Sequence, residues 1–174
     1  MSTIMADSNL MSGQQEVLSQ ENLLLMDETV KEVFGMMLGL DVIVEGEAKL
    51  EPNDTSRHEQ TAIVGFAGII SGMCEITIGN HGSVLITGAM LGDPSSEQSS
   101  DAVCDALGEL GNMLAGGWKN RIPLLGSGCS LSVPTVIEGN SYNLHRPANA
   151  KLARRSYTFA KDHQLMLTLL YDPK

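Results

Sequence analysis

Basic residues are scarce in this sequence: its 174 residues include 11 Lys and Arg against 21 Asp and Glu, which gives a formal net charge of −10. A chain this acidic has few cations with which to bind a nucleic-acid backbone, and anionic lipid headgroups repel it. We therefore expect no nucleic-acid partner and no membrane partner.

Long apolar runs are missing as well. The longest one, residues 63–73, is interrupted by three glycines and is too short to cross a bilayer. The first fifteen residues have neither the basic start nor the apolar stretch of a signal peptide. The three cysteines lack the paired spacing of a disulfide or zinc site. These absences predict a cytoplasmic protein with reduced thiols.

Common catalytic motifs are also absent, since the chain has no Walker phosphate loop and no GxSxG turn. The four histidines lie far apart, without Cys or carboxylate neighbours at ligand spacing. The sequence therefore predicts no metal site and no cofactor of its own.

The length and a mean hydropathy of +0.01 fit one domain with its own hydrophobic core. Residues 1–19 are polar and lack periodicity, which predicts a flexible N-terminal arm. Residues 20–174 form the predicted domain. Leu18-Ser19-Gln20-Glu21 is open to two interpretations: a helix start capped by Ser19, or a weak likeness to the regulator-binding peptide of flagellar switch proteins.

Hydrophobic periodicity predicts an α+β fold, an antiparallel sheet with helices packed on one face. Asp93-Pro94 is a strong signal for a helix start, and Arg154-Arg155 is expected to be solvent-exposed beside the closing hairpin. Helices are predicted over residues 21–38, 84–91 and 93–119, and strands over residues 42–50, 60–66, 72–78, 129–137, 154–160 and 164–171.

The predicted helix 93–119 carries two opposite stripes. Its apolar stripe consists of Val103, Leu107, Leu110, Leu114 and Trp118. Asp105, Glu109 and Asn112 lie on the other side, one turn apart. An acidic stripe is also what any solvated helix shows. However, Asn is a poor helix former, and Gly108 and Gly116 flank the same face. The pattern favours a face on which another protein docks closely.

Asp105, Glu109 and Asn112 match a family signature together with Pro134. Asp105-x3-Glu109-x2-Asn112, with Pro134 after 21 further positions, fits (Asp or Ser)-x3-Glu-x2-Asn-x~21-Pro of the CheC/CheX chemotaxis phosphatases. The sequence therefore resembles this family.

The resemblance extends over residues 21–171 and beyond the motif. Residues 33–40 look like the end of the first helix of CheX-type domains, and the link 68–72 lies where that fold joins two strands. Some members of the family carry the motif twice, on two pseudo-symmetric helices. Here the first helix offers Asp27-x3-Lys31-x2-Phe34, which lacks the Glu and the Asn. The chain is therefore predicted to have one site and to be closer to CheX than to CheC.

The resemblance implies a phosphatase that acts on the aspartyl phosphate of a CheY-like response regulator. It implies that Asn112 orients the attacking water and that Glu109 pairs with the regulator's lysine. Asp105 at the rim, Gly108 and Gly116 on the docking face and Pro134 at the strand edge are expected to have supporting roles. It also implies that the regulator brings Mg²⁺ and that this chain forms a homodimer. Two alternatives remain: a catalytically silent adaptor that binds a regulator or a flagellar-switch component, and a structural domain with an accidental motif.

Overall fold

The computed structural model describes residues 17–49, 59–93, 95, 97–139 and 146–172. The described strands form one seven-stranded antiparallel sheet in the order β1-β6-β7-β3-β2-β4, and β5 also pairs with β2. The helices are α2 (Gln20–Glu32), the π-helix η1 (Val33–Leu38), α3 (Asn80–Leu91), α4 (Ser100–Arg121) and α5 (Pro123–Gly128). The strands are β1 (Val42–Glu47), β2 (Glu59–Gly68), β3 (Ser71–Gly79), β4 (Cys129–Leu131), β5 (Thr135–Gly139), β6 (Lys151–Phe159) and β7 (His163–Asp172).

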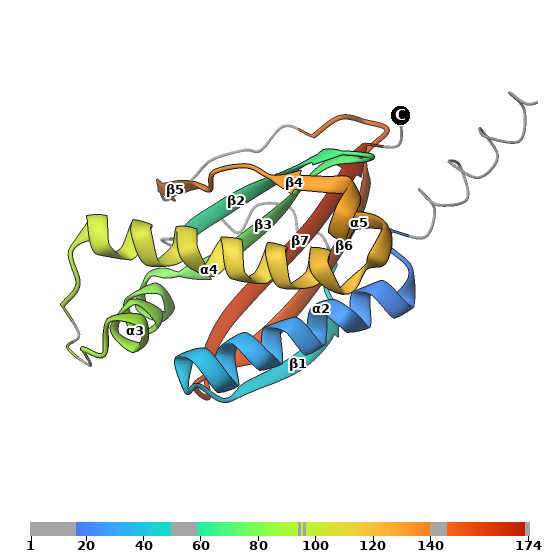
Figure 1. The fold of residues 1–174 in the computed structure, drawn as a ribbon. Helices are drawn as coiled ribbons and strands as arrows, with labels where there is room; N and C mark the ends of the chain where they lie inside the picture. The colour runs from blue at the N-terminus through green and yellow to red at the C-terminus, as the bar shows by residue number, and fades with distance from the viewer. Residues whose placement is uncertain (1–16, 50–58, 94, 96, 140–145, 173–174) are drawn as a thin grey trace, which may run out of the picture.

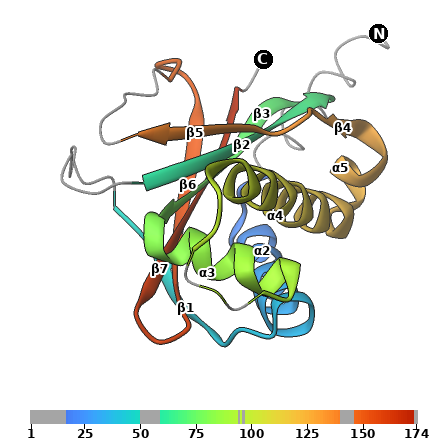
Figure 2. The same ribbon diagram turned by 90° about the vertical axis from the view of Figure 1, so that its left-hand side faces the viewer.

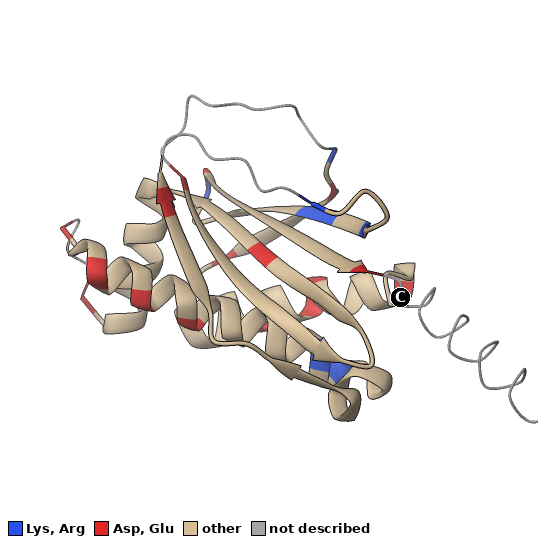
Figure 3. Ribbon diagram, turned by 90° about the horizontal axis from the view of Figure 1, so that it is seen from above, with Lys and Arg blue, Asp and Glu red and all other residues tan. Residues whose placement is uncertain are grey.

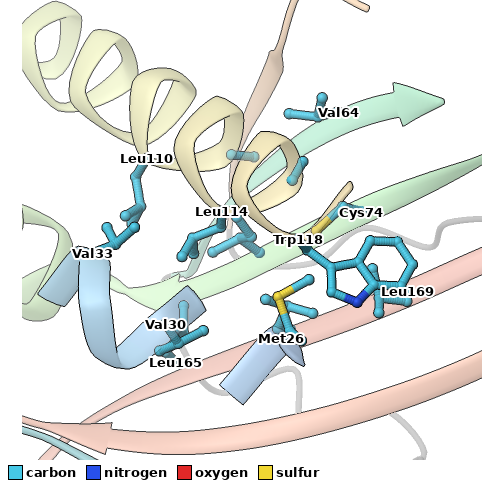
Figure 4. Packing of buried hydrophobic residues seen from close by; sticks show 14 of the residues in the cluster. Met26, Val30, Val33, Val64, Cys74, Leu110, Leu114, Trp118, Leu165 and Leu169 are labelled. Carbon is cyan, nitrogen blue, oxygen red and sulfur yellow. The ribbon is translucent and has the colours of Figure 1, made fainter. Parts of the chain in front are cut away.

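The helices cover one face of the sheet, with α4 and α2 lying across it (Figures 1 and 2). This arrangement confirms the predicted α+β architecture. Alternate residues of the central strands point toward the helices, and Cys74 of β3 pairs with Leu169 of β7 in the middle of the buried face. Figure 4 shows Leu114 and Trp118 of α4 packed over this layer beside Met26 of α2. Within the described residues, no helix is long and apolar enough to cross a membrane.

The first helix begins as predicted and ends in an unpredicted way. The Ser19 hydroxyl accepts a hydrogen bond from the Asn22 amide at 3.2 Å, so Ser19 caps α2. The last six residues form the π-helix η1, which Gly39 terminates at a φ of 65°. Most of the predicted N-terminal arm lies outside the described residues, and Val17 near its end is buried.

The start of the central helix differs from the prediction. The helix expected from Asp93 begins at Ser100, because Ser99 supplies the cap and accepts from the Ala102 amide at 3.2 Å. The Asp93 carboxylate accepts instead from the Ser95 amide at 3.0 Å, a local turn that competes with a helix start. Gly92, with a φ of 67°, ends the preceding helix immediately before this turn.

The predicted strand 129–137 is also wrong as a single element. It is divided into β4 and β5, which pair with two separate parts of β2. Pro134 lies between them, and a proline has no amide hydrogen for the ladder.

Arg155 is buried rather than exposed, which contradicts the expectation for Arg154-Arg155. It forms an ion pair with Asp27 of α2, and the Tyr157 hydroxyl donates to the same carboxylate at 2.8 Å. Burial alone would lower the pKa of Arg155, but the hydrogen bond and charge of Asp27 outweigh it and raise that pKa. Burial, reinforced by the Asp27 charge, also raises the pKa of Tyr157. This cluster joins the first helix to the penultimate strand.

Candidate active site

The predicted stripes of α4 are present in the structure. The five residues of the apolar stripe are each at most 3% exposed. Asp105 and Glu109 are exposed, Asn112 is half-buried, and the helix is unbroken through all three. Figure 3 shows acidic residues spaced along this helix. The side chains of these three residues form no hydrogen bond or ion pair with any residue that the structure describes. They are therefore available to another molecule.

The two flanking glycines allow close packing inside the chain. A Cβ at the buried Gly108 would lie 3.3 Å from Pro134 Cγ, and a Cβ at Gly116 would lie 3.5 Å from Leu131 Cδ1. The space beside Gly108 is thus occupied by Pro134 of the same chain, whereas the sequence favoured an approaching partner there. Pro134 lies at the strand edge beside the helix, where the signature residue was expected.

Polar contacts hold the N-terminal end of α4. The Ser100 hydroxyl donates to Glu138 Oε2 of β5 at 2.9 Å, and Gln60 of β2 donates to Glu138 Oε1 at 3.2 Å. Gln60 is itself buried and also donates to Asn80 at the start of α3. This network was not predicted from the sequence. Its members are far apart in the chain, and each is of a residue type that is common on protein surfaces.

The C-terminal end of α4 is held as firmly. Trp118 Nε1 donates to the Asn22 carbonyl of α2 at 2.7 Å, and the buried Lys119 ammonium donates to the Gly126 carbonyl at 2.7 Å. Arg121 forms an ion pair with Glu32. Asn112 therefore lies near the middle of a helix that is fixed at both ends, and such a helix holds its side chains in defined positions.

The chemistry open to this face is limited by its residue types. In the described part of the chain, no three His, Cys, Asp or Glu side chains gather to hold a metal ion. A carboxylate and a carboxamide lie one turn apart instead. A carboxylate such as that of Glu109 can accept hydrogen bonds from a cationic group, while the Asn112 amide has an acceptor oxygen and a donor NH₂ group.

The family profile described as "Chemotaxis phosphatase CheX" matches residues 60–156, a segment that contains the whole signature. This chain belongs to the CheX family. A curated relative, "CheY-P phosphatase CheX" of Thermotoga maritima, is 28% identical over 87 residues, which cover 50% of this chain and 56% of the relative. The match thus spans little more than half of that protein.

Solved CheX structures share the fold. A chemotaxis protein CheX from Desulfovibrio desulfuricans has a TM-score of 0.73 at 20% identity, covering 87% of this chain and 99% of that one. The CheX of a CheX–CheY–BeF₃–Mg²⁺ complex from Borrelia burgdorferi has a TM-score of 0.66 at 15% identity, covering 86% and 97%. These likenesses extend the CheX-type fold to almost all of the described domain.

The incomplete second motif on the first helix has a structural explanation. Asp27 points into the interior and pairs with Arg155, and Phe34 is fully buried against Phe159 with ring centroids 5.2 Å apart. Lys31 is exposed. In this CheX-family chain, two of the three positions therefore serve the core, and the described part of α2 offers no second carboxylate–amide pair.

Proposed function

We propose that this chain hydrolyses the aspartyl phosphate of a CheY-type response regulator. The observation that carries the proposal is that the Glu109 and Asn112 side chains, on the fixed helix of a CheX-family domain, bond to no residue that the structure describes. The activity named for the Thermotoga maritima relative and the complex of the Borrelia burgdorferi protein with CheY are consistent with it.

The reaction needs a correctly placed water more than it needs covalent chemistry. Water attacks the phosphorus in line with the bond between the phosphorus and the aspartyl oxygen. This P–O bond breaks, and inorganic phosphate and the free aspartate carboxylate result. In our proposal the Asn112 carboxamide oxygen accepts from this water, and its NH₂ group donates to a phosphoryl oxygen. A neutral amide does this without placing a negative charge beside the phosphoryl group.

Glu109 is proposed to dock the partner. One turn before Asn112, its exposed carboxylate would meet the lysine of the regulator's active site and fix the register of the two proteins. Asp105, one turn further back at the rim, adds negative charge to the same face. Such complementary charges act mainly on encounter and on orientation.

The direct test measures phosphate release from phosphorylated CheY-type regulators with and without this protein. Under our proposal, release accelerates with catalytic amounts of protein. If the protein binds a regulator loaded with beryllofluoride and Mg²⁺ but leaves the release rate unchanged, the chain is a silent adaptor and the catalytic proposal is wrong.

Replacing Glu109 by Ala should weaken docking. Truncating one member of a partly desolvated charge pair costs about 2–5 kcal/mol, so we expect KM and the Kd for the beryllofluoride-loaded regulator to rise at least tenfold. Asp101→Asn is the matched control, because this carboxylate is exposed in the first turn of the same helix. Tight binding by Glu109→Ala would instead favour a direct chemical role for Glu109.

Magnesium is proposed to belong to the regulator. We expect EDTA to abolish the stimulated hydrolysis, excess Mg²⁺ to restore it, and calorimetric titration of this protein alone with MgCl₂ to show no binding. Stoichiometric binding to the free protein would contradict the assignment. The homodimer implied by the family resemblance also stays a prediction, which light scattering tests.

A further inference from the structure

The junction of β4 and β5 is a β-bulge. Leu131 pairs with Phe66 of β2, and Thr135 pairs with Ile63. Three residues, 132–134, therefore stand opposite two, Val64 and Gly65. Such an extra residue interrupts the ladder and redirects a side chain, and bulges are frequent next to active sites.

The bulge lies alongside Asn112. A Cβ at Gly108 would contact Pro134, and a Cβ at Gly116 would contact Leu131. These two glycines are eight residues apart, or about 12 Å along the helix, and Asn112 is midway between them. Residues 131–134 run from beside Gly116 to beside Gly108, so the middle of this segment is level with Asn112. Figure 2 shows β4 and β5 beside α4.

The bulge is held rigidly. The Ser132 hydroxyl accepts from the Gly65 amide at 2.8 Å and donates to the Val133 carbonyl at 2.9 Å, and the Ser132 amide donates to the Gly65 carbonyl at 2.9 Å. Pro134 restricts the residue before it to extended conformations. Val133 is therefore fixed between two anchored neighbours.

This rigid segment presents an apolar side chain to solvent. Val133 is 86% exposed, the largest fraction among the large hydrophobic side chains that the structure describes. The side chain does not contribute to the hydrophobic core. Because it is fixed and exposed, it loses little conformational entropy when a partner covers it.

We propose that Val133 is a second docking residue for the phosphorylated regulator, forming an apolar contact next to the site that Asn112 serves. This inference rests on the proposed function. Asp105 and Glu109 of α4 provide negative charge. Val133 provides an apolar contact, which the regulator buries only if the two surfaces come close together.

Val133→Asp tests the contact. We expect KM, and the Kd for a CheY-type regulator loaded with beryllofluoride and Mg²⁺, to rise on the order of tenfold, with kcat unchanged. Ser132→Ala removes two of the hydrogen bonds that hold the bulge, and it should raise KM by a smaller factor than Val133→Asp does. Circular dichroism and thermal unfolding of both variants verify the fold.

Ile43→Asp is the matched control. Ile43 is also β-branched and 61% exposed, but it lies on β1, at the opposite end of the strand order from β4. An equal rise in KM for this control would overturn the inference. So would a Val133→Asp variant that binds and turns over like an active wild type, while the proposed function would stand. If the wild type neither binds nor hydrolyses any regulator tested, the proposed function fails and this inference fails with it.

Discussion

Asn112→Ala should lower the kcat for regulator dephosphorylation by about 100-fold or more. Losing one contact made mainly in the transition state typically costs a few kcal/mol. KM should change little, because the amide is neutral and, in our proposal, its contact with the water strengthens mainly as the water attacks. Asn112 is half-buried on an exposed helix face and bonds no described side chain, so the substitution should leave the fold intact. Steady-state phosphate release over a range of regulator concentrations separates the two parameters.

Two further variants make this test specific. Asn120→Ala removes an exposed asparagine eight residues along the same helix, and it should keep wild-type kinetics. Asn112→Asp keeps the shape of the side chain but adds a negative charge beside the phosphoryl group, and we expect it to lose as much activity as Asn112→Ala. If Asn112→Ala keeps its kcat while still folded, the water-positioning role is wrong and the adaptor is the better account.

The buried face of α4 was predictable from the sequence because it depends on periodicity alone. Leu107, Leu114 and Trp118 recur at helical spacing, and a helix on a sheet must bury one such stripe. The helix start was not predictable in this way. Asp93 and Ser99 are both acceptable caps, and the choice depends on the turn that follows Gly92 and on the contact of Ser100 with β5.

Long-range pairing explains the other differences. Arg155 is followed by a residue pattern typical of a strand, and local sequence shows nothing of Asp27, 128 positions earlier. Pro134 did carry a usable signal, since a proline inside an apolar run indicates an edge or a bulge. It could not indicate that Val133 would lie level with Asn112. That position depends on the packing of Gly108 against Pro134 and of Gly116 against Leu131, which the sequence does not show.

Asp27→Ala should lower the free energy of unfolding by about 3–5 kcal/mol, because it leaves the buried Arg155 charge without its partner. The Tyr157 hydroxyl loses its acceptor as well. Urea unfolding followed by Trp118 fluorescence measures the change. Trp118 is the single tryptophan of the chain, and it is buried and bonded to Asn22 of α2, so it reports directly on the packing of α2 and α4.

The size of this effect depends on burial, and two variants isolate that dependence. Asp105→Ala removes an exposed carboxylate from α4 and should change the free energy of unfolding by less than about 0.5 kcal/mol. Combining Asp27→Leu and Arg155→Met with Tyr157→Phe removes both charges and the hydroxyl that would otherwise lose its acceptor, and it should recover most of the lost stability, because apolar side chains of similar size replace a buried pair at little cost. A loss below 1 kcal/mol for Asp27→Ala would show that water reaches Arg155 and that the cluster is not a buried anchor. Since the described bonds of the Asp27 side chain are to Arg155 and Tyr157 of β6 and to none of the α4 residues, the folded fraction of Asp27→Ala should retain the wild-type kcat.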